Sequence, residues 1–150
     1  MSASSHGPKV SCLLVTADRP QLIKRALRCY QQQTYEPLEL VVLDNGTEPV
    51  EPVVRSFDLP GEVRYRHVER GPDLWIGGLR NRALRMATGE IVVPQWDDDD
   101  WSHPERIERQ VEVLRRGYDV CTLQGTLMHV HDPDYFHHPF IGILPDGVPP

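Results

Sequence analysis

The sequence has few cysteines, few aromatic residues and no long apolar segment. Cys12, Cys29 and Cys121 are far apart and form no Cys-x-x-Cys pair, which excludes a disulfide framework and a zinc-finger pattern. No apolar run approaches the ~20 residues needed to cross a bilayer. Residues 1–8 lack a positive region followed by an apolar core, so we expect a flexible tail and no signal peptide. These features predict a reduced, cytoplasmic protein without a membrane span.

An excess of positive charge is also missing. The chain has 16 Lys and Arg against 22 Asp and Glu, for a net charge of −6 at pH 7. Nucleic-acid-binding proteins usually carry a basic surface, so we expect no nucleic-acid partner. The length of 150 residues, with 39% hydrophobic and 25% charged residues, is typical of a globular protein with one core.

Apolar segments of strand length alternate with amphipathic segments of helix length. Strands are predicted at 10–16, 38–43, 63–68, 91–93 and 119–130, and helices at 18–32, 53–57, 77–87 and 102–116. Asp18 can cap the first helix, Leu84 is expected to face the core, and Ser102-His-Pro-Glu105 is a capping-box sequence. The alternation predicts an α/β fold with a largely parallel sheet and right-handed crossovers.

Polar residues follow three of the predicted strands, at Thr16–Arg19, Asp44–Gly46 and Asp97–Asp100. Ligands of parallel sheets bind beyond the carboxyl ends of the strands, so these residues are candidates for a site. Four consecutive carboxylates repel one another, and Mg²⁺ or Mn²⁺, which prefer oxygen ligands, would relieve that repulsion. The alternative is a solvated acidic turn that also caps the next helix.

Four segments, taken in order, resemble the family-2 glycosyltransferases, which have the GT-A fold. They are similar to that family's Thr-x-Asn-Arg-Pro turn, Asp-Asp-Gly-Ser turn, Gly-x-x-Arg-Asn-x-x-Leu helix and Asp-x-Asp (DXD) motif. The matching segments are Val10–Pro20, Leu40–Thr47, Gly78–Leu84 and Gly89–Pro104. The resemblance implies a GT-A (Rossmann-like) three-layer sandwich with a mostly parallel sheet.

The resemblance also implies a nucleoside-diphosphate-sugar donor and the residues that hold it. The implied nucleotide-sugar-binding residues are Thr16, Arg19, Asp44, Arg80, Asp97 and Asp98. In the family, the positions of Thr16 and Arg19 lie along the nucleotide, and that of Asp44 holds the edge of the base. From the sequence alone, Asp44 can instead be a turn residue.

The Asp-x-Asp segment and the helix before it are implied to hold the diphosphate end of the donor. Asp97 corresponds to the aspartate that meets the ribose, Asp99 to the ligand of Mn²⁺ or Mg²⁺, and Asp98 lies between them. Arg80 corresponds to the arginine that faces the diphosphate, although it can also be a solvated helix residue. A metal ion and an arginine together stabilise the negative charge of a leaving diphosphate.

The catalytic residue cannot be assigned. The family's acceptor half and its general base, usually in a Glu-Asp pair, lie further along, and no such pair follows Asp119. We therefore expect a nucleotide-sugar domain over 9–131 and, in the proline-rich residues 132–150, the start of a truncated acceptor region. An inverting transfer needs a carboxylate base, and the downstream carboxylates are Asp132, Asp134 and Asp146.

Two function hypotheses follow. The first is a metal-dependent inverting glycosyltransferase acting on a saccharide, lipid-linked or small-molecule acceptor. The second is a degenerate nucleotide-sugar-binding domain without catalysis. A phosphohydrolase would need its Asp-x-Asp after the first strand, and a nucleotidyltransferase would need a basic, glycine-rich first loop, so both fit less well. His129 and His131, which share a strand face, are candidate metal ligands or exposed polar residues.

Overall fold

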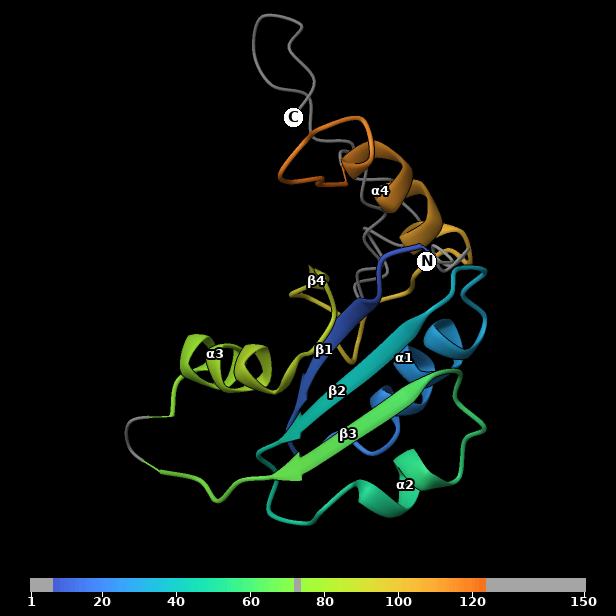
Figure 1. Cartoon of the computed structure of the whole chain (residues 1–150). Coiled ribbons are helices and arrows are strands. Elements are labelled where there is room, and N and C mark those ends of the chain that lie inside the picture. Colours follow the sequence, from blue (N-terminus) through green and yellow to red (C-terminus); the bar gives the residue numbers. More distant parts are fainter. Residues whose placement is uncertain (1–6, 72–73, 124–150) are drawn as a thin grey trace, which may run out of the picture. The chain divides into compact units, whose positions relative to one another are not determined.

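The computed structural model describes residues 7–71 and 74–123 (Figure 1). Strands and helices alternate along the chain, as the sequence predicts. The elements are β1 (Val10–Thr16), α1 (Leu22–Gln31), β2 (Leu38–Asp44), α2 (Glu51–Arg55), β3 (Glu62–His67), α3 (Ile76–Met86), β4 (Ile91–Val93) and α4 (Arg106–Leu114).

The four strands form one parallel sheet in the order β3-β2-β1-β4. The chain moves outward from β1 to β3 and then returns to place β4 on the other side of β1. This reversal makes a topological switch point at the carboxyl ends of β1 and β4, where ligands bind in open α/β sheets. The α/β class and the parallel sheet predicted from the sequence are confirmed.

The sheet lies between helices, with α3 on one face and α1 and α2 on the other (Figure 1). Every residue of β2 is buried, as expected for a strand covered on both sides. Leu13, Val41 and Leu43 form a core with Leu79 and Ala83 of α3. On the other face, Ile23, Ala26, Leu27 and Tyr30 of α1 are buried. Burial of these side chains holds the strand ends in fixed positions.

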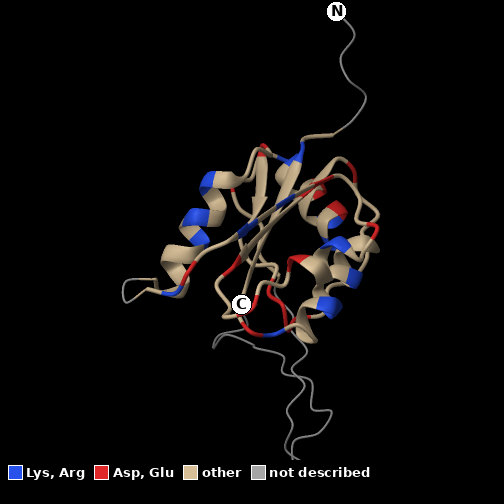
Figure 2. Cartoon of the chain, turned by 90° about the horizontal axis from the view of Figure 1, so that it is seen from below, with Lys and Arg blue, Asp and Glu red and all other residues tan. Residues whose placement is uncertain are grey.

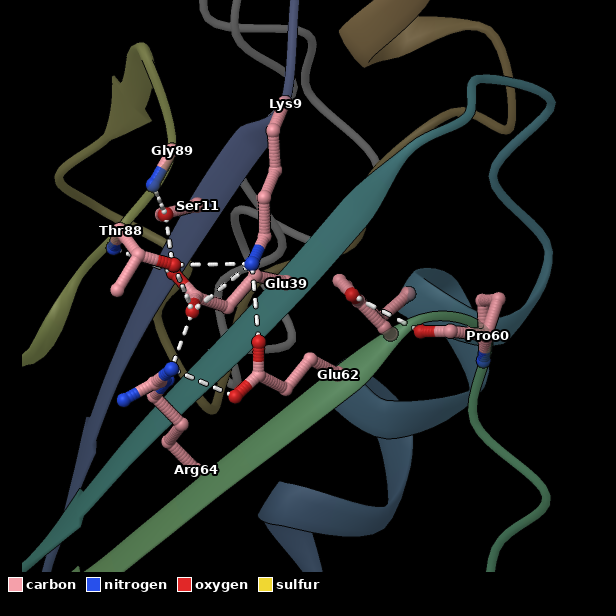
Figure 3. Close-up of polar contacts among 9 residues, drawn as sticks. Lys9, Ser11, Glu39, Pro60, Glu62, Arg64, Thr88 and Gly89 are labelled. Carbon is pink, nitrogen blue, oxygen red and sulfur yellow. Dashed lines mark hydrogen bonds and ion pairs between the residues drawn. The ribbon is translucent and has the colours of Figure 1, made fainter. Parts of the chain in front are cut away.

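A buried ionic cluster lies near the amino ends of β1, β2 and β3 (Figure 3). Glu39 has no exposed surface, and its carboxylate accepts hydrogen bonds from Ser11 Oγ, Thr88 N (2.9 Å), Thr88 Oγ1 (2.7 Å) and Arg64 Nε (2.8 Å). Lys9 Nζ lies 3.4 Å from Glu39. Burial opposes ionisation, but these bonds and the charge of Lys9 lower the pKa of Glu39 to about 2.

Three local predictions are wrong. Asp18 does not cap α1, because the N-cap residue is Gln21, without a side-chain capping bond. The capping box before α4 does not form, since the Glu105 amide donates to His103 Nδ1 (3.2 Å) and Ser102 Oγ accepts from Arg106 (2.9 Å). Leu84 is exposed rather than inward-facing, because Leu79 and Ala83 supply the face of α3 that packs on the sheet.

The chain divides into two compact units, Met1–Arg109 and Gln110–Pro150. The sheet lies in the first unit. In the second, residues 119–123 form no strand, contrary to prediction, and 124–130, the rest of the predicted fifth strand, lie outside the described residues. The predicted limits at residues 8 and 131 stay predictions. Among the described residues, no helix has both the length and the apolar character needed to cross a membrane.

Candidate functional site

The carboxyl ends of three strands align at one edge of the sheet. Thr16 ends β1 opposite Asp44, which ends β2, and Asp44 lies opposite His67, which ends β3. Beyond β4, the Trp96 amide donates to the Leu13 carbonyl (3.0 Å). That bond brings the chain after β4 to the same edge as Thr16. Parallel pairing therefore collects residues far apart in the sequence.

Asp98 joins the ends of β1 and β4. Its Oδ2 accepts from Thr16 Oγ1 (2.7 Å), and its Oδ1 accepts from Arg19 Nη1 (3.1 Å). Only 4% of Asp98 is exposed. Arg19 also pairs with Asp99 Oδ2 (3.3 Å), and its bond to Asp98 raises the pKa of its guanidinium group. Both oxygens of Asp98 are thus occupied by the chain itself.

Arg80 links α3 to the aspartate segment. Its Nη2 donates to Asp97 Oδ1 (2.9 Å), and about a third of each side chain is exposed. The bond lies next to the switch point between β1 and β4. Arg80 and Asp97 thus stay accessible from solvent while holding each other in place, so an added ligand can reach both.

Asp99 and Asp100 are the most exposed carboxylates of the segment. Half of the Asp99 side chain is exposed, and its carbonyl oxygen accepts from Arg25 Nη1 (3.1 Å). Partial burial and the negative charges of Asp97 and Asp99 raise the pKa of Asp100. The repulsion expected among the four carboxylates is therefore present in the fold.

A divalent cation at this edge would need oxygen ligands from the aspartate segment. Among residues 7–71 and 74–123, no group of three or more His, Cys, Asp or Glu side chains could hold a metal ion. Mg²⁺ commonly binds through one or two carboxylates and completes its shell with water and substrate phosphates. Asp99, with an accessible carboxylate, fits that mode of binding.

The two tryptophans beside the aspartates differ in environment. Trp96 is 2% exposed, donates from Nε1 to the Ala26 carbonyl (3.1 Å) and packs under Arg106. Trp101 is largely exposed and contacts His103 edge-on. Trp96 therefore anchors the segment in the core, and Trp101 lies at the surface.

Asp44 organises the turn after β2. Its Oδ1 accepts from the Gly46 amide (2.8 Å), and its Oδ2 accepts from the Val50 amide (2.8 Å) and the Tyr65 hydroxyl (2.6 Å). Burial and the bond to Asp44 raise the pKa of Tyr65. Asp44 has no exposed surface. These contacts match the turn interpretation of Asp44. A ligand that bound this carboxylate would have to share one of its oxygens with the Gly46 amide, the Val50 amide or the Tyr65 hydroxyl.

Asp18 and Arg70 form a second link at the same edge. Asp18 has a φ of 54°, and its Oδ1 accepts from the Thr47 amide (2.6 Å), a bond that lowers the pKa of Asp18. Arg70 pairs with Asp18 Oδ2 and donates from Nε to the Asn45 carbonyl (3.1 Å). Asp18 thus ties the first turn to the second.

Sequence reasoning missed Arg70 and Tyr65. Arg70 follows β3 closely, so the rule that selected residues after the other strands would have found it if applied to β3 as well. Tyr65 lies inside β3, and only the strand register places its hydroxyl beside Asp44. Thr16, Arg19, Asp98 and Asp99 meet as one group, Arg80 meets Asp97, and Asp44 bonds to none of these residues.

The amino-acid sequence matches a known family. The family model for "Glycosyl transferase family 2" matches residues 11–143. The chain belongs to this family. The family 2 chain is 30% identical over 144 residues to "Glucosyl-dolichyl phosphate glucuronosyltransferase" of Haloferax volcanii, covering 91% of this chain and 44% of the relative. It spans less than half the length of the curated relatives that it matches.

Solved family structures show the same fold. The mannosyltransferase PcManGT from Pyrobaculum calidifontis, in complex with GDP-Man and Mn²⁺, is 28% identical with a TM-score of 0.58, over 87% of this chain and 37% of that one. TarS of S. aureus in complex with UDP-GlcNAc is 21% identical with a TM-score of 0.61, over 72% of this chain and 31% of that one. The GT-A fold predicted for this family 2 chain is confirmed.

Proposed function

We propose that this chain binds a nucleoside-diphosphate sugar at the carboxyl edge of its sheet and serves in a metal-dependent, inverting transfer of the sugar. The observation that carries the proposal is the meeting of Thr16, Arg19, Arg80 and Asp97–Asp99 at the switch point of a family 2 fold. The related mannosyltransferase structure holds GDP-Man and Mn²⁺.

Each residue of the group has a role in the proposed complex. Arg80, held by Asp97, places a guanidinium group where the diphosphate lies, because guanidinium pairs well with phosphate oxygens. Asp97 has a second carboxylate oxygen to offer the ribose. Thr16 and Arg19 lie along the nucleotide, and Asp98 keeps them in position. Asp44 shapes the turn that receives the edge of the base.

Asp99 is the proposed ligand for Mn²⁺ or Mg²⁺. A bound cation would stabilise the negative charge that develops on the leaving diphosphate. Asp99 is suited to this role because its carboxylate is half exposed and, among the described residues, has one polar partner, Arg19. Asp98, whose oxygens accept from Thr16 and Arg19, is a positioning residue rather than a ligand.

The acceptor and the base that deprotonates it stay open. Asp132, Asp134 and Asp146, together with His129 and His131, lie outside the described residues. The relative from H. volcanii is named for a dolichyl-phosphate-linked substrate, so a lipid-linked acceptor is the first class to test. We place the protein in the cytoplasm, a location supported by its three free cysteines.

Binding without transfer is the competing function. A panel of UDP-, GDP- and dTDP-sugars with Mn²⁺, assayed for released nucleoside diphosphate with and without acceptors, separates the two. Acceptor-dependent release that is lost in Asp99→Ala supports the transferase. Tight donor binding without release by the full-length protein would favour the non-catalytic alternative.

A further inference from the structure

A cavity lies between α3 and the end of β3. Its volume is about 760 Å³, and it is formed by the end of β3, residues 68–70, Leu74 and one side of α3. The lining residues are Leu43, Arg66, His67, Val68, Glu69, Arg70, Leu74, Arg82, Arg85 and Met86. Thr16, Arg80 and Asp97–Asp99 are not among them, so the groove adjoins the carboxyl edge through His67 and Arg70 but is lined by other residues than the proposed donor site.

The groove concentrates positive charge on an acidic chain. Among the described residues, its walls carry four arginines against one carboxylate, Glu69, whereas the whole chain has a net charge of −6. Basic residues recur along α3 (Figure 2). Arg70 is engaged by Asp18 and Asn45. Within the described part of the chain, Arg66, Arg82 and Arg85 have no hydrogen-bond or ion-pair partner.

The spacing of these arginines keeps like charges close together. Arg82 and Arg85 are three residues apart on α3, and residues at this spacing are neighbours on a helix surface. Arg66 faces them from β3 across the groove, on the same side of the sheet as Leu43. Like charges at i,i+3 repel, and an anion bound between the three guanidinium groups would relieve that repulsion.

The floor of the groove is apolar. Val68, Leu74 and Met86 pack against the core cluster that contains Leu43. A cavity of this volume falls in the usual range for small-molecule sites and is far larger than a phosphate ion requires.

We propose that this groove, defined by Arg66, Arg82 and Arg85 above an apolar floor, binds the phosphate or diphosphate group of a ligand other than the sugar donor. Guanidinium groups bind phosphate oxygens in paired, charge-assisted hydrogen bonds, which suits arginine better than lysine to this task. The groove also adjoins the donor edge, because His67 Nε2 lies 2.9 Å from the Gly46 carbonyl in the turn after β2.

The test is a calorimetric titration of the 150-residue chain with pyrophosphate in EDTA, together with mapping of backbone amide shifts by NMR. We expect shifts around residues 66–70 and 82–86. Arg82→Gln, Arg85→Gln and Arg66→Gln should each weaken binding about tenfold, the usual effect of losing one charge-assisted hydrogen bond. Arg28→Gln, at an exposed position on α1, is the matched control. Circular dichroism checks that each variant is folded.

Three results of these experiments would contradict a phosphate site in the groove. An equal loss in Arg28→Gln, shifts confined to residues near Arg80 and Asp97, or no binding at millimolar pyrophosphate would overturn the proposal. The source of the phosphate is resolved by comparing pyrophosphate and dodecyl phosphate with vesicles of phosphatidylcholine containing phosphatidylglycerol. Sedimentation with these vesicles that is lost in Arg82→Gln identifies a lipid headgroup, and tighter binding of dodecyl phosphate without sedimentation identifies a soluble ligand.

Discussion

Replacing Glu39 by Gln tests the energetics of the buried cluster at the amino end of the sheet. The Glu39 carboxylate accepts bonds from Ser11, Thr88 and Arg64 without exposure to solvent. Its pKa falls from 4.5 to about 2 in the folded chain, and at 1.36 kcal/mol per pKa unit this corresponds to about 3 kcal/mol of stability at neutral pH. Glu39→Gln should lower the free energy of unfolding at pH 7 by about that amount.

The sign of the pH dependence follows from the lowered pKa. Above about pH 4.5 Glu39 is ionised in both states and its full stabilisation is present. As the pH falls towards 2, the unfolded chain takes up a proton before the folded chain does, so the stabilisation disappears. The difference between wild type and Glu39→Gln should therefore shrink to about 1 kcal/mol at pH 3, when urea unfolding is followed by tryptophan fluorescence.

Glu62→Gln is the matched control. Glu62 pairs with Lys9 and Arg64 in the same cluster, but nearly half of its side chain is exposed, so its loss should cost about 1 kcal/mol or less. A difference between wild type and Glu39→Gln that stays constant from pH 7 to pH 3 would refute the reasoning. Equal destabilisation by Glu39→Gln and Glu62→Gln would do the same.

Two substitutions separate structural from binding roles at the carboxyl edge. Asp44→Ala leaves the Gly46 and Val50 amides without their acceptor, so urea unfolding should show a loss of about 1–3 kcal/mol for each unpaired group. If calorimetry then finds unchanged nucleotide affinity in the folded fraction, Asp44 only makes the turn. Arg80→Gln should weaken nucleoside-diphosphate binding about tenfold. Arg28→Gln, at an exposed position on α1, should leave that affinity unchanged, and equal losses in both variants would exclude a specific role for Arg80.

Periodicity and local signals were sufficient to locate the four strands of the sheet. The apolar runs at 10–16 and 91–93 coincide with β1 and β4, because strands covered on both faces need continuous hydrophobic residues. Helix ends were harder to predict. Asp18 has the side chain of a cap, but its φ of 54° and its bond to Thr47 direct the carboxylate to a neighbouring turn, and that tertiary contact has no local sequence signal.

The residues of the candidate site, too, could be predicted only in part from the sequence. Residues after strands could be named from the sequence because parallel strands end at one edge. The sequence could not predict how the four carboxylates divide their roles. Asp98 is buried and accepts hydrogen bonds from Thr16 and Arg19, which lie far before it in the sequence. Asp99 is left accessible. That difference depends on packing after β4, where Trp96 is inserted into the core.

The most direct test of the proposed function is donor binding with and without a divalent cation. Calorimetry of the chain with GDP and with UDP, in Mn²⁺ and then in EDTA, measures the contribution of the metal. At least one nucleotide should bind more tightly in Mn²⁺, Asp99→Ala should remove this difference, and Asp100→Ala should reduce it less. Equal affinity in both buffers, or an unchanged metal effect in Asp99→Ala, would contradict a metal-dependent donor site at the aspartate segment.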